Sequence, residues 1–276
     1  MEDLKAMFGD TLPGVLPEPF ASLPPGALHH DGPGTLARDT LRHLLLAAAL
    51  LAPLAWSLGR LAGLSPWYAA KCLALGGLAA LLLWRGLPAH RPHGRFGAAN
   101  RVTLLRLSGV ALLAGGLGEP LAGRPDLAWA VVGVATAAAL LDALDGPLAR
   151  ARGLASAFGA RFDMETDALL MAVLSLLILQ SGRTGTWVLA AGGLRYAFVA
   201  AAVVWPWLGR PLPPSFRRKA VCVVQIVCLI ACLGPVIPPA WASAMAAAGL
   251  AALVYSFAAD VAWLARRRHL ALEIEA

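Results

Sequence analysis

Long apolar runs alternate with short polar segments along most of the chain. Because about 20 apolar residues in a helix span the hydrocarbon core of a bilayer, each run is expected to form one membrane-crossing helix. The expected spans lie near residues 41–59, 67–84, 101–117, 127–146, 165–181, 186–206, 220–237 and 240–264. The pattern therefore predicts an all-α, polytopic membrane helix bundle with about eight transmembrane helices.

The composition agrees with this pattern. Hydrophobic residues make up 59% of the chain and charged residues only 14%, and the mean hydropathy is +0.68. Soluble domains contain about 25% charged residues, so the composition excludes an ordinary soluble protein. Residues 1–40 are the exception, because they are polar and rich in proline. We expect this segment to be an extended or loosely ordered cytoplasmic arm.

The basic residues predict the orientation of the helices. With the N-terminus inside, the cytoplasmic segments hold 17 lysines and arginines, and the opposite loops hold only Arg60, Arg124 and Arg183. Because loops rich in Lys and Arg stay in the cytoplasm, both termini are expected there, in a multi-pass protein of a bacterial cytoplasmic membrane. The net charge of +7 is interpreted as topology and attraction to anionic lipid; no nucleic-acid partner is expected.

The motif that carries the chemistry lies between two expected spans. It reads D-x-x-D-G-x-x-A-R, then eight residues, then G-x-x-x-D-x-x-x-D. Its residues are Asp142, Asp145, Gly146, Ala149, Arg150, Gly159, Asp163 and Asp167. Four carboxylates within 26 residues, beside apolar helices, repel one another and lose hydration unless a cation lies among them. A divalent metal ion is the natural counter-charge.

Helical spacing favours such a metal site. Asp142 and Asp145 lie three residues apart, and Asp163 and Asp167 lie four apart, so each pair projects from one face of its helix. Two such faces that meet would form a cage of oxygen ligands. Hard oxygen ligands suit Mg²⁺ or Mn²⁺ that bridges substrate phosphates, and they suit zinc less well.

The other motif residues fit a phosphate-containing ligand. Gly146 and Gly159 let a nucleotide or a neighbouring helix come close to the backbone, and Arg150 adds a fork-shaped donor for phosphate oxygens. At all eight positions and spacings the motif resembles the signature of the CDP-alcohol phosphotransferase (CDP-alcohol phosphatidyltransferase) family of integral membrane enzymes. The resemblance covers roughly residues 98–265.

This resemblance implies a division of the chain. Residues 96–276 correspond to the family's six-helix transmembrane core, and residues 41–95 form two additional N-terminal transmembrane helices. The arm of residues 1–40 precedes them. Homodimers are usual in the family, so a homodimer is expected.

The resemblance also implies roles for the motif residues. The expected metal ligands are Asp142, Asp145, Asp163 and Asp167. Asp167 is in addition expected to take the proton from the acceptor hydroxyl and to contact the second ion of a two-metal site. The expected CDP-binding residues are Asn100, Thr103, Arg106, Asp142, Gly146, Ala149, Arg150 and Gly159.

Three of the CDP-binding residues come from a second element. Asn100, Thr103 and Arg106 resemble the N-x-x-T-x-x-R element that opens the family's first core helix, with Ala99 where proline is frequent. Their spacing places an amide, a hydroxyl and a guanidinium on one helix face. The alternative for Arg106 is that its side chain reaches to the cytoplasmic interface.

Basic residues also point to an anionic acceptor. Arg195 lies in the middle of an expected span, where an unpaired guanidinium is costly, and family members with phosphorylated acceptors often have arginine in this helix. The expected acceptor-binding residues are Arg195, Arg217, Arg218 and Lys219. The alternative for Arg195 is an ion pair with a motif carboxylate. Asp260 is expected to pair with Arg266–Arg268 or to cap the site.

The predicted function is metal-dependent transfer of a phosphatidyl group from CDP-diacylglycerol to a polar alcohol, with release of CMP, in phospholipid biosynthesis. The first expected acceptor is glycerol 3-phosphate and the second an inositol phosphate. One alternative is a soluble CDP-choline or CDP-ethanolamine donor with a lipid alcohol acceptor, and another is a non-phosphorylated acceptor such as serine or choline. A membrane carrier that binds CDP is the alternative outside the enzymes.

Overall fold

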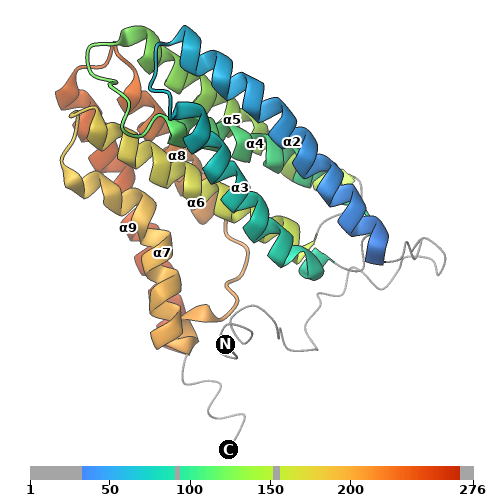
Figure 1. The fold of residues 1–276 in the computed structure, drawn as a ribbon. Helices are drawn as coiled ribbons and strands as arrows, with labels where there is room; N and C mark the ends of the chain where they lie inside the picture. Colours follow the sequence, from blue (N-terminus) through green and yellow to red (C-terminus); the bar gives the residue numbers. More distant parts are fainter. Residues whose placement is uncertain (1–32, 91–93, 152–155, 268–276) are drawn as a thin grey trace, which may run out of the picture.

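The computed structural model describes residues 33–90, 94–151 and 156–267, without the side chains of residues 33–34 and 143–151. In this part of the chain every regular element is helical, as predicted (Figure 1). The α-helices are α2 Pro33–Leu61, α3 Tyr68–Gly86, α4 Ala98–Gly115, α5 Pro125–Ala151, α6 Ala157–Gln180, α7 Leu189–Val204, α8 Phe216–Leu233 and α9 Pro239–Arg267. Short 3-10 helices η2 Leu87–His90, η3 Thr186–Val188 and η4 Pro206–Gly209 lie between them.

Five of these helices are long and apolar enough to cross a membrane. They contain the stretches Thr35–Leu61, Tyr68–His90, Pro125–Asp142, Thr186–Val204 and Pro239–Arg267. The chain is therefore an integral membrane helix bundle. Helices α4, α6 and α8 also form where spans were expected, but each carries charged residues within its first three turns, and none of them is among these five. The predicted total of eight spans, and the homodimer, stay predictions.

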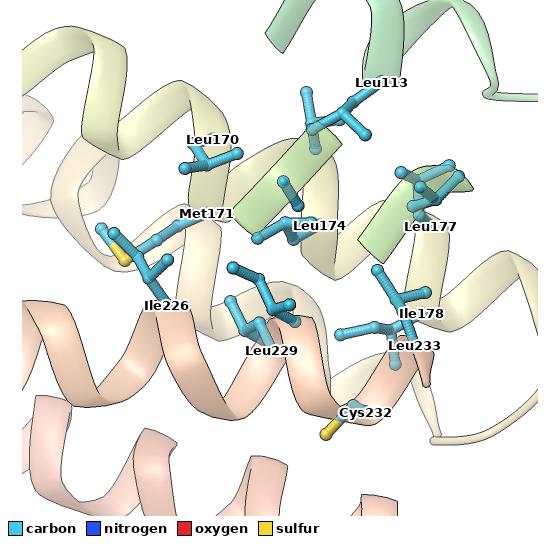
Figure 2. Close-up of a cluster of buried hydrophobic side chains, with 14 of the residues drawn as sticks. Leu113, Leu170, Met171, Leu174, Leu177, Ile178, Ile226, Leu229, Cys232 and Leu233 are labelled. Carbon is cyan, nitrogen blue, oxygen red and sulfur yellow. The ribbon is translucent and has the colours of Figure 1, made fainter. Parts of the chain in front are cut away.

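The three polar helices meet along an apolar core. Met171, Leu174 and Ile178 of α6 lie beside Ile226, Leu229 and Leu233 of α8 in Figure 2. Leu174, Ile178 and Leu229 have no exposed surface. The α6 positions recur at intervals of three and four residues, so they form one stripe along the helix. This packing sets the depth of the charged N-terminal halves of α6 and α8 relative to each other.

The N-terminal helices α2 and α3 pack against α4. Near the start of α3 there are also hydrogen bonds to the loop that follows α4. The Glu119 carboxylate, only 3% exposed, lies in the loop after α4. It accepts hydrogen bonds from the Ser65 backbone N–H (2.8 Å), the Ser65 hydroxyl (2.5 Å) and Lys71 Nζ (2.8 Å). Lys71 lies in the first turn of α3, near the start of the stretch Tyr68–His90, and this position brings its ammonium to the cluster.

The pKa of Glu119 reflects these partners. Burial raises the pKa of the carboxyl group. Hydrogen bonds from Lys71 and Ser65, together with the charge of Lys71, lower it by more than burial raises it, so the net shift is downward. The ionised carboxylate is therefore favoured in the folded protein.

This downward shift predicts an acid-sensitive contribution to stability. A carboxylate whose pKa is lower in the folded state stabilises the fold above the unfolded pKa of about 4.3, and this contribution is lost as pH falls through the folded pKa. We expect Glu119→Gln to lower the thermal midpoint at pH 7, and we expect the gap to wild type to narrow below about pH 4.3. Asp126→Asn, at an exposed position in the first turn of α5, is the control. A gap that stays constant from pH 7 to pH 3 would contradict the assignment.

Candidate active site

Three of the four predicted carboxylates meet in the structure. Asp142 comes from α5, and Asp163 and Asp167 come from α6. One oxygen of each lies within 4.8 Å of an oxygen of the other two. The side chains are partly buried, with 21%, 38% and 18% of their surface exposed, respectively. The cluster is thus accessible from one side and packed on the other.

The rest of the D-x-x-D-G-x-x-A-R segment belongs to the last turns of α5. The backbone of this segment is helical, but its side chains lie outside the described residues. The predicted site residues concerned are Asp145, Gly146, Ala149 and Arg150. Their expected roles in metal and nucleotide binding stay predictions.

Arg106 lies at the centre of the carboxylate cluster. Its guanidinium contacts Asp142 Oδ1 at 3.0 Å and forms ion pairs with Asp163 and Asp167. The side chain is 1% exposed, so it points into the bundle and does not reach to the interface. A buried guanidinium is costly without partners, and neighbouring carboxylates repel one another without a cation. Each therefore stabilises the other.

The other two residues of the α4 element are also buried. Asn100 Nδ2 donates to the Phe96 carbonyl (2.5 Å), and Thr103 Oγ1 donates to the Ala99 carbonyl (3.1 Å). A Cβ atom built on Gly159 would lie 2.9 Å from Asn100 Oδ1, which is closer than real contacts allow. A side chain at position 159 would therefore displace the Asn100 amide, so glycine suits the close approach of α6 to Asn100, which is the neighbouring-helix explanation offered by the sequence.

A cavity of about 210 Å³ opens beside the cluster. Its lining residues are Asp142, Asp163, Asp167, Lys219, Cys222, Val223 and Ile226. Among the predicted acceptor-binding residues, Lys219 lines this cavity directly. Cys222 was not predicted to lie here, because a cysteine in an apolar helix usually packs as a small hydrophobic residue. The cavity thus joins three carboxylates and one ammonium.

Arg217 and Arg218 have a different environment. Both contact Asp260 Oδ1 of α9, at 2.6 Å and 3.3 Å, and Arg217 Nη1 also donates to the Ser256 carbonyl (2.6 Å). The expectation that Asp260 pairs with Arg266–Arg268 is therefore wrong for the described residues of that cluster. Because α8 and α9 run antiparallel, the first turn of α8 lies opposite Asp260. Arg266 and Arg267 lie nearly two turns further along α9 and are exposed.

Arg195 forms an ion pair with Glu165. Glu165 lies between Asp163 and Asp167 in sequence, but its side chain projects from another face of α6 and is 53% exposed. The structure therefore does not show the alternative pairing of Arg195 with a motif carboxylate. No sequence pattern linked the two residues, since they lie on different helices and 30 positions apart.

One comparison with known proteins agrees with this geometry. The family model for CDP-alcohol phosphatidyltransferase matches residues 96–257, which run from the segment before α4 into α9. No curated protein and no solved structure matched the chain. The match begins after α2 and α3, so the two N-terminal helices lie outside it.

The position of Arg106 predicts a coupling between this residue and metal ions. Arg106→Gln leaves the three carboxylates without their guanidinium, and breaking a buried ion pair typically costs about 3–5 kcal/mol. We expect a lower thermal midpoint in EDTA than for wild type, and a larger rise on addition of Mn²⁺, because the ion replaces the lost charge. Arg101→Gln, at an exposed position of the same helix, is the control. An unchanged midpoint for Arg106→Gln would contradict the central role of Arg106.

Proposed function

Because the chain belongs to the CDP-alcohol phosphatidyltransferase family, we propose that it transfers the phosphatidyl group of CDP-diacylglycerol to a polar alcohol and releases CMP. It is a transferase of substituted phosphate groups by family membership; the donor, the acceptor and the metal are the proposal. The observation that supports it best is the cluster of Asp142, Asp163 and Asp167 around Arg106, with a cavity beside it.

The carboxylate oxygens of the cluster fit a hard divalent cation as ligands. Three carboxylate oxygens that lie within 4.8 Å of one another are the ligand type that Mg²⁺ and Mn²⁺ prefer. The proposed ligands are Asp142, Asp145, Asp163 and Asp167, in a two-metal site. When bound, such ions would neutralise charge on the diphosphate and on the departing CMP.

Asp167 is the proposed general base. It borders the cavity and is held by the Arg106 guanidinium. In the proposed reaction the acceptor oxygen forms a bond to the phosphorus that carries diacylglycerol, and the bond from this phosphorus to CMP breaks. Asp167 accepts the proton of the acceptor hydroxyl. Arg106 keeps the Asp167 carboxylate oriented. Its proposed roles are therefore two, to position the base and to contact the nucleotide.

The nucleotide is proposed to lie at the first turns of α4 and α6. Asn100 and Gly159 meet there, and Thr103 and Arg106 continue the same face of α4. Gly146, Ala149 and Arg150 are proposed to complete the nucleotide site from α5. This arrangement lets CDP arrive from water while the acyl chains of the donor stay in the bilayer.

The proposed setting is the cytoplasmic face of a bacterial inner membrane. Its support is the distribution of basic residues along the sequence, which are concentrated in the segments expected on the same side of the membrane as the carboxylate motif. A homodimer is part of the proposal on the strength of family membership.

The acceptor is proposed to be a phosphorylated polyol, with glycerol 3-phosphate first and an inositol phosphate second. Lys219 in the cavity wall supports an anionic ligand, because its ammonium can form a charge-assisted hydrogen bond with the acceptor phosphate. Arg217 and Arg218 lie in the same turn of α8. Arg195 would have to exchange Glu165 for the acceptor phosphate.

An acceptor screen tests this proposal. CDP-diacylglycerol is supplied with glycerol 3-phosphate, inositol phosphates, serine or choline, and product is measured by mass spectrometry. We expect turnover with a phosphorylated polyol, and we expect Lys219→Ala and Arg195→Ala to raise the acceptor KM far more than the donor KM. Arg210→Ala, at an exposed position before α8, is the control. Turnover with choline or ethanolamine and none with any phosphorylated alcohol would overturn the acceptor assignment.

The proposed base gives a second prediction. Asp167→Asn should lower kcat by about 10²–10⁴-fold, the usual effect of removing a general base, while binding of CMP with Mn²⁺ stays measurable. Asp142→Ala should instead lose the metal-dependent binding of CMP, because it removes a ligand and leaves the base in place. If Asp167→Asn retained more than about a tenth of the wild-type kcat, another group would have to be the base.

A further inference from the structure

His90 is a buried residue outside the family match that lies next to the candidate site. It ends η2, directly after α3, and has no exposed surface. Its ring packs against the Phe158 ring of α6, with the centroids 5.2 Å apart. A histidine in such a place can be a space-filling residue or a hydrogen-bonding one, and its partners distinguish the two.

Both ring nitrogens of His90 have polar partners. Nε2 lies 3.0 Å from the carbonyl oxygen of Arg95, and Nδ1 lies 2.8 Å from Oγ of Ser156. Because a carbonyl only accepts, Nε2 carries a proton, and in the neutral ring Nδ1 then accepts from the Ser156 hydroxyl. Ser156 Oγ in turn accepts from the backbone N–H of Gly159 (3.0 Å). A continuous chain of hydrogen bonds therefore runs from Arg95 through His90 to Gly159.

The far end of this chain sets the start of α6. Ser156 is the N-cap of α6, with extended backbone angles (φ −141°, ψ 155°), and its bond to Gly159 satisfies an N–H group that the helix leaves free. Gly159 begins the G-x-x-x-D-x-x-x-D half of the motif. One and two turns later, the same helix carries Asp163 and Asp167.

The near end of the chain sets the start of α4. Next to Arg95, the Phe96 N–H donates to Asp39 Oδ2 of α2 (2.9 Å), and the Phe96 carbonyl accepts from Asn100. Gly97, the N-cap of α4, has φ +86°, a conformation that strongly favours glycine. Residues of α2 and η2 thus hold the turn from which the Asn100 face of α4 begins.

We propose that His90 is a positioning residue for the nucleotide site. By bonding both Arg95 and Ser156, it fixes the first turn of α6 against the first turn of α4, at the point where Gly159 and Asn100 meet. The N-terminal helices α2 and α3 are then part of the scaffold of the site. This inference rests on the proposed function in one respect, the location of the nucleotide at these two turns.

Two substitutions separate hydrogen bonding from packing. His90→Gln keeps a donor and an acceptor but loses the ring, whereas His90→Phe keeps an aromatic ring and loses both hydrogen bonds. The readouts are the Kd of CMP in the presence of Mn²⁺ and the thermal midpoint, for the full-length protein in detergent. Loss of a buried hydrogen bond is commonly worth about a fivefold change in an equilibrium constant. We expect His90→Phe to weaken CMP binding about five- to tenfold and His90→Gln to stay within about twofold of wild type.

The opposite order overturns the inference: tight binding by His90→Phe and weak binding by His90→Gln would show that the ring only fills space. Should His90→Phe not be recovered folded, Ser156→Ala tests the same chain from α6, with Ser108→Ala as control, since the Ser108 hydroxyl bonds a carbonyl of its own helix. Unchanged CMP affinity for Ser156→Ala would then overturn it. Failure of wild type to bind CMP would remove the proposed function together with this inference, whereas equal binding by wild type and His90→Phe removes this inference alone.

Discussion

The ion pairs of Arg106 with three carboxylates are the interaction on which the arrangement of the polar helices depends. A guanidinium that is 1% exposed inside an apolar bundle requires anionic partners, and three carboxylates within a few ångströms require a cation. The partners come from α4, α5 and α6, so satisfying the charges fixes both the depth and the rotation of these helices. The buried guanidinium would be destabilising without the carboxylates, and the carboxylates would repel one another without the guanidinium. Formation of the cluster is therefore cooperative.

The same charges decide which helices can face lipid. The first three turns of α4, α6 and α8 carry ionisable residues, and these helices are the ones that do not qualify as spans by composition. They therefore have to be shielded by neighbours that do qualify. Helices α2 and α3 pack on the α4 side, and the apolar contact between α6 and α8 (Figure 2) leaves Leu174, Ile178 and Leu229 without exposed surface. Packing and charge thus support the same arrangement.

The sequence predicts those features that depend on one helix at a time. The helix positions and the shared face of Asp163 and Asp167 follow from helical spacing alone. The partners of Arg106, Arg195 and Asp260 depend on how helices cross, and spacing does not determine crossing. That is why Glu165 was missed and why the partner expected for Asp260 was wrong. His90 gave no signal, because a histidine near a loop is ordinarily solvated; only Ser156, as a preferred N-cap residue before a helix, could have been noticed.

The two N-terminal helices are bonded to the core at both ends, and this limits what they can be. Backbone hydrogen bonds within each helix satisfy its polar groups in lipid. A helix pair that only covered the core would therefore need no side-chain hydrogen bonds to the core. Yet Asp39 and His90 bond the turn before α4 and the cap of α6, while Ser65 and Lys71 bond Glu119 after the end of α4. Helix α4 is therefore held at its beginning and beyond its end by the same added pair. Since α4 carries Arg106, sliding it along its axis would break bonds at both ends as well as the ion pairs at the carboxylates.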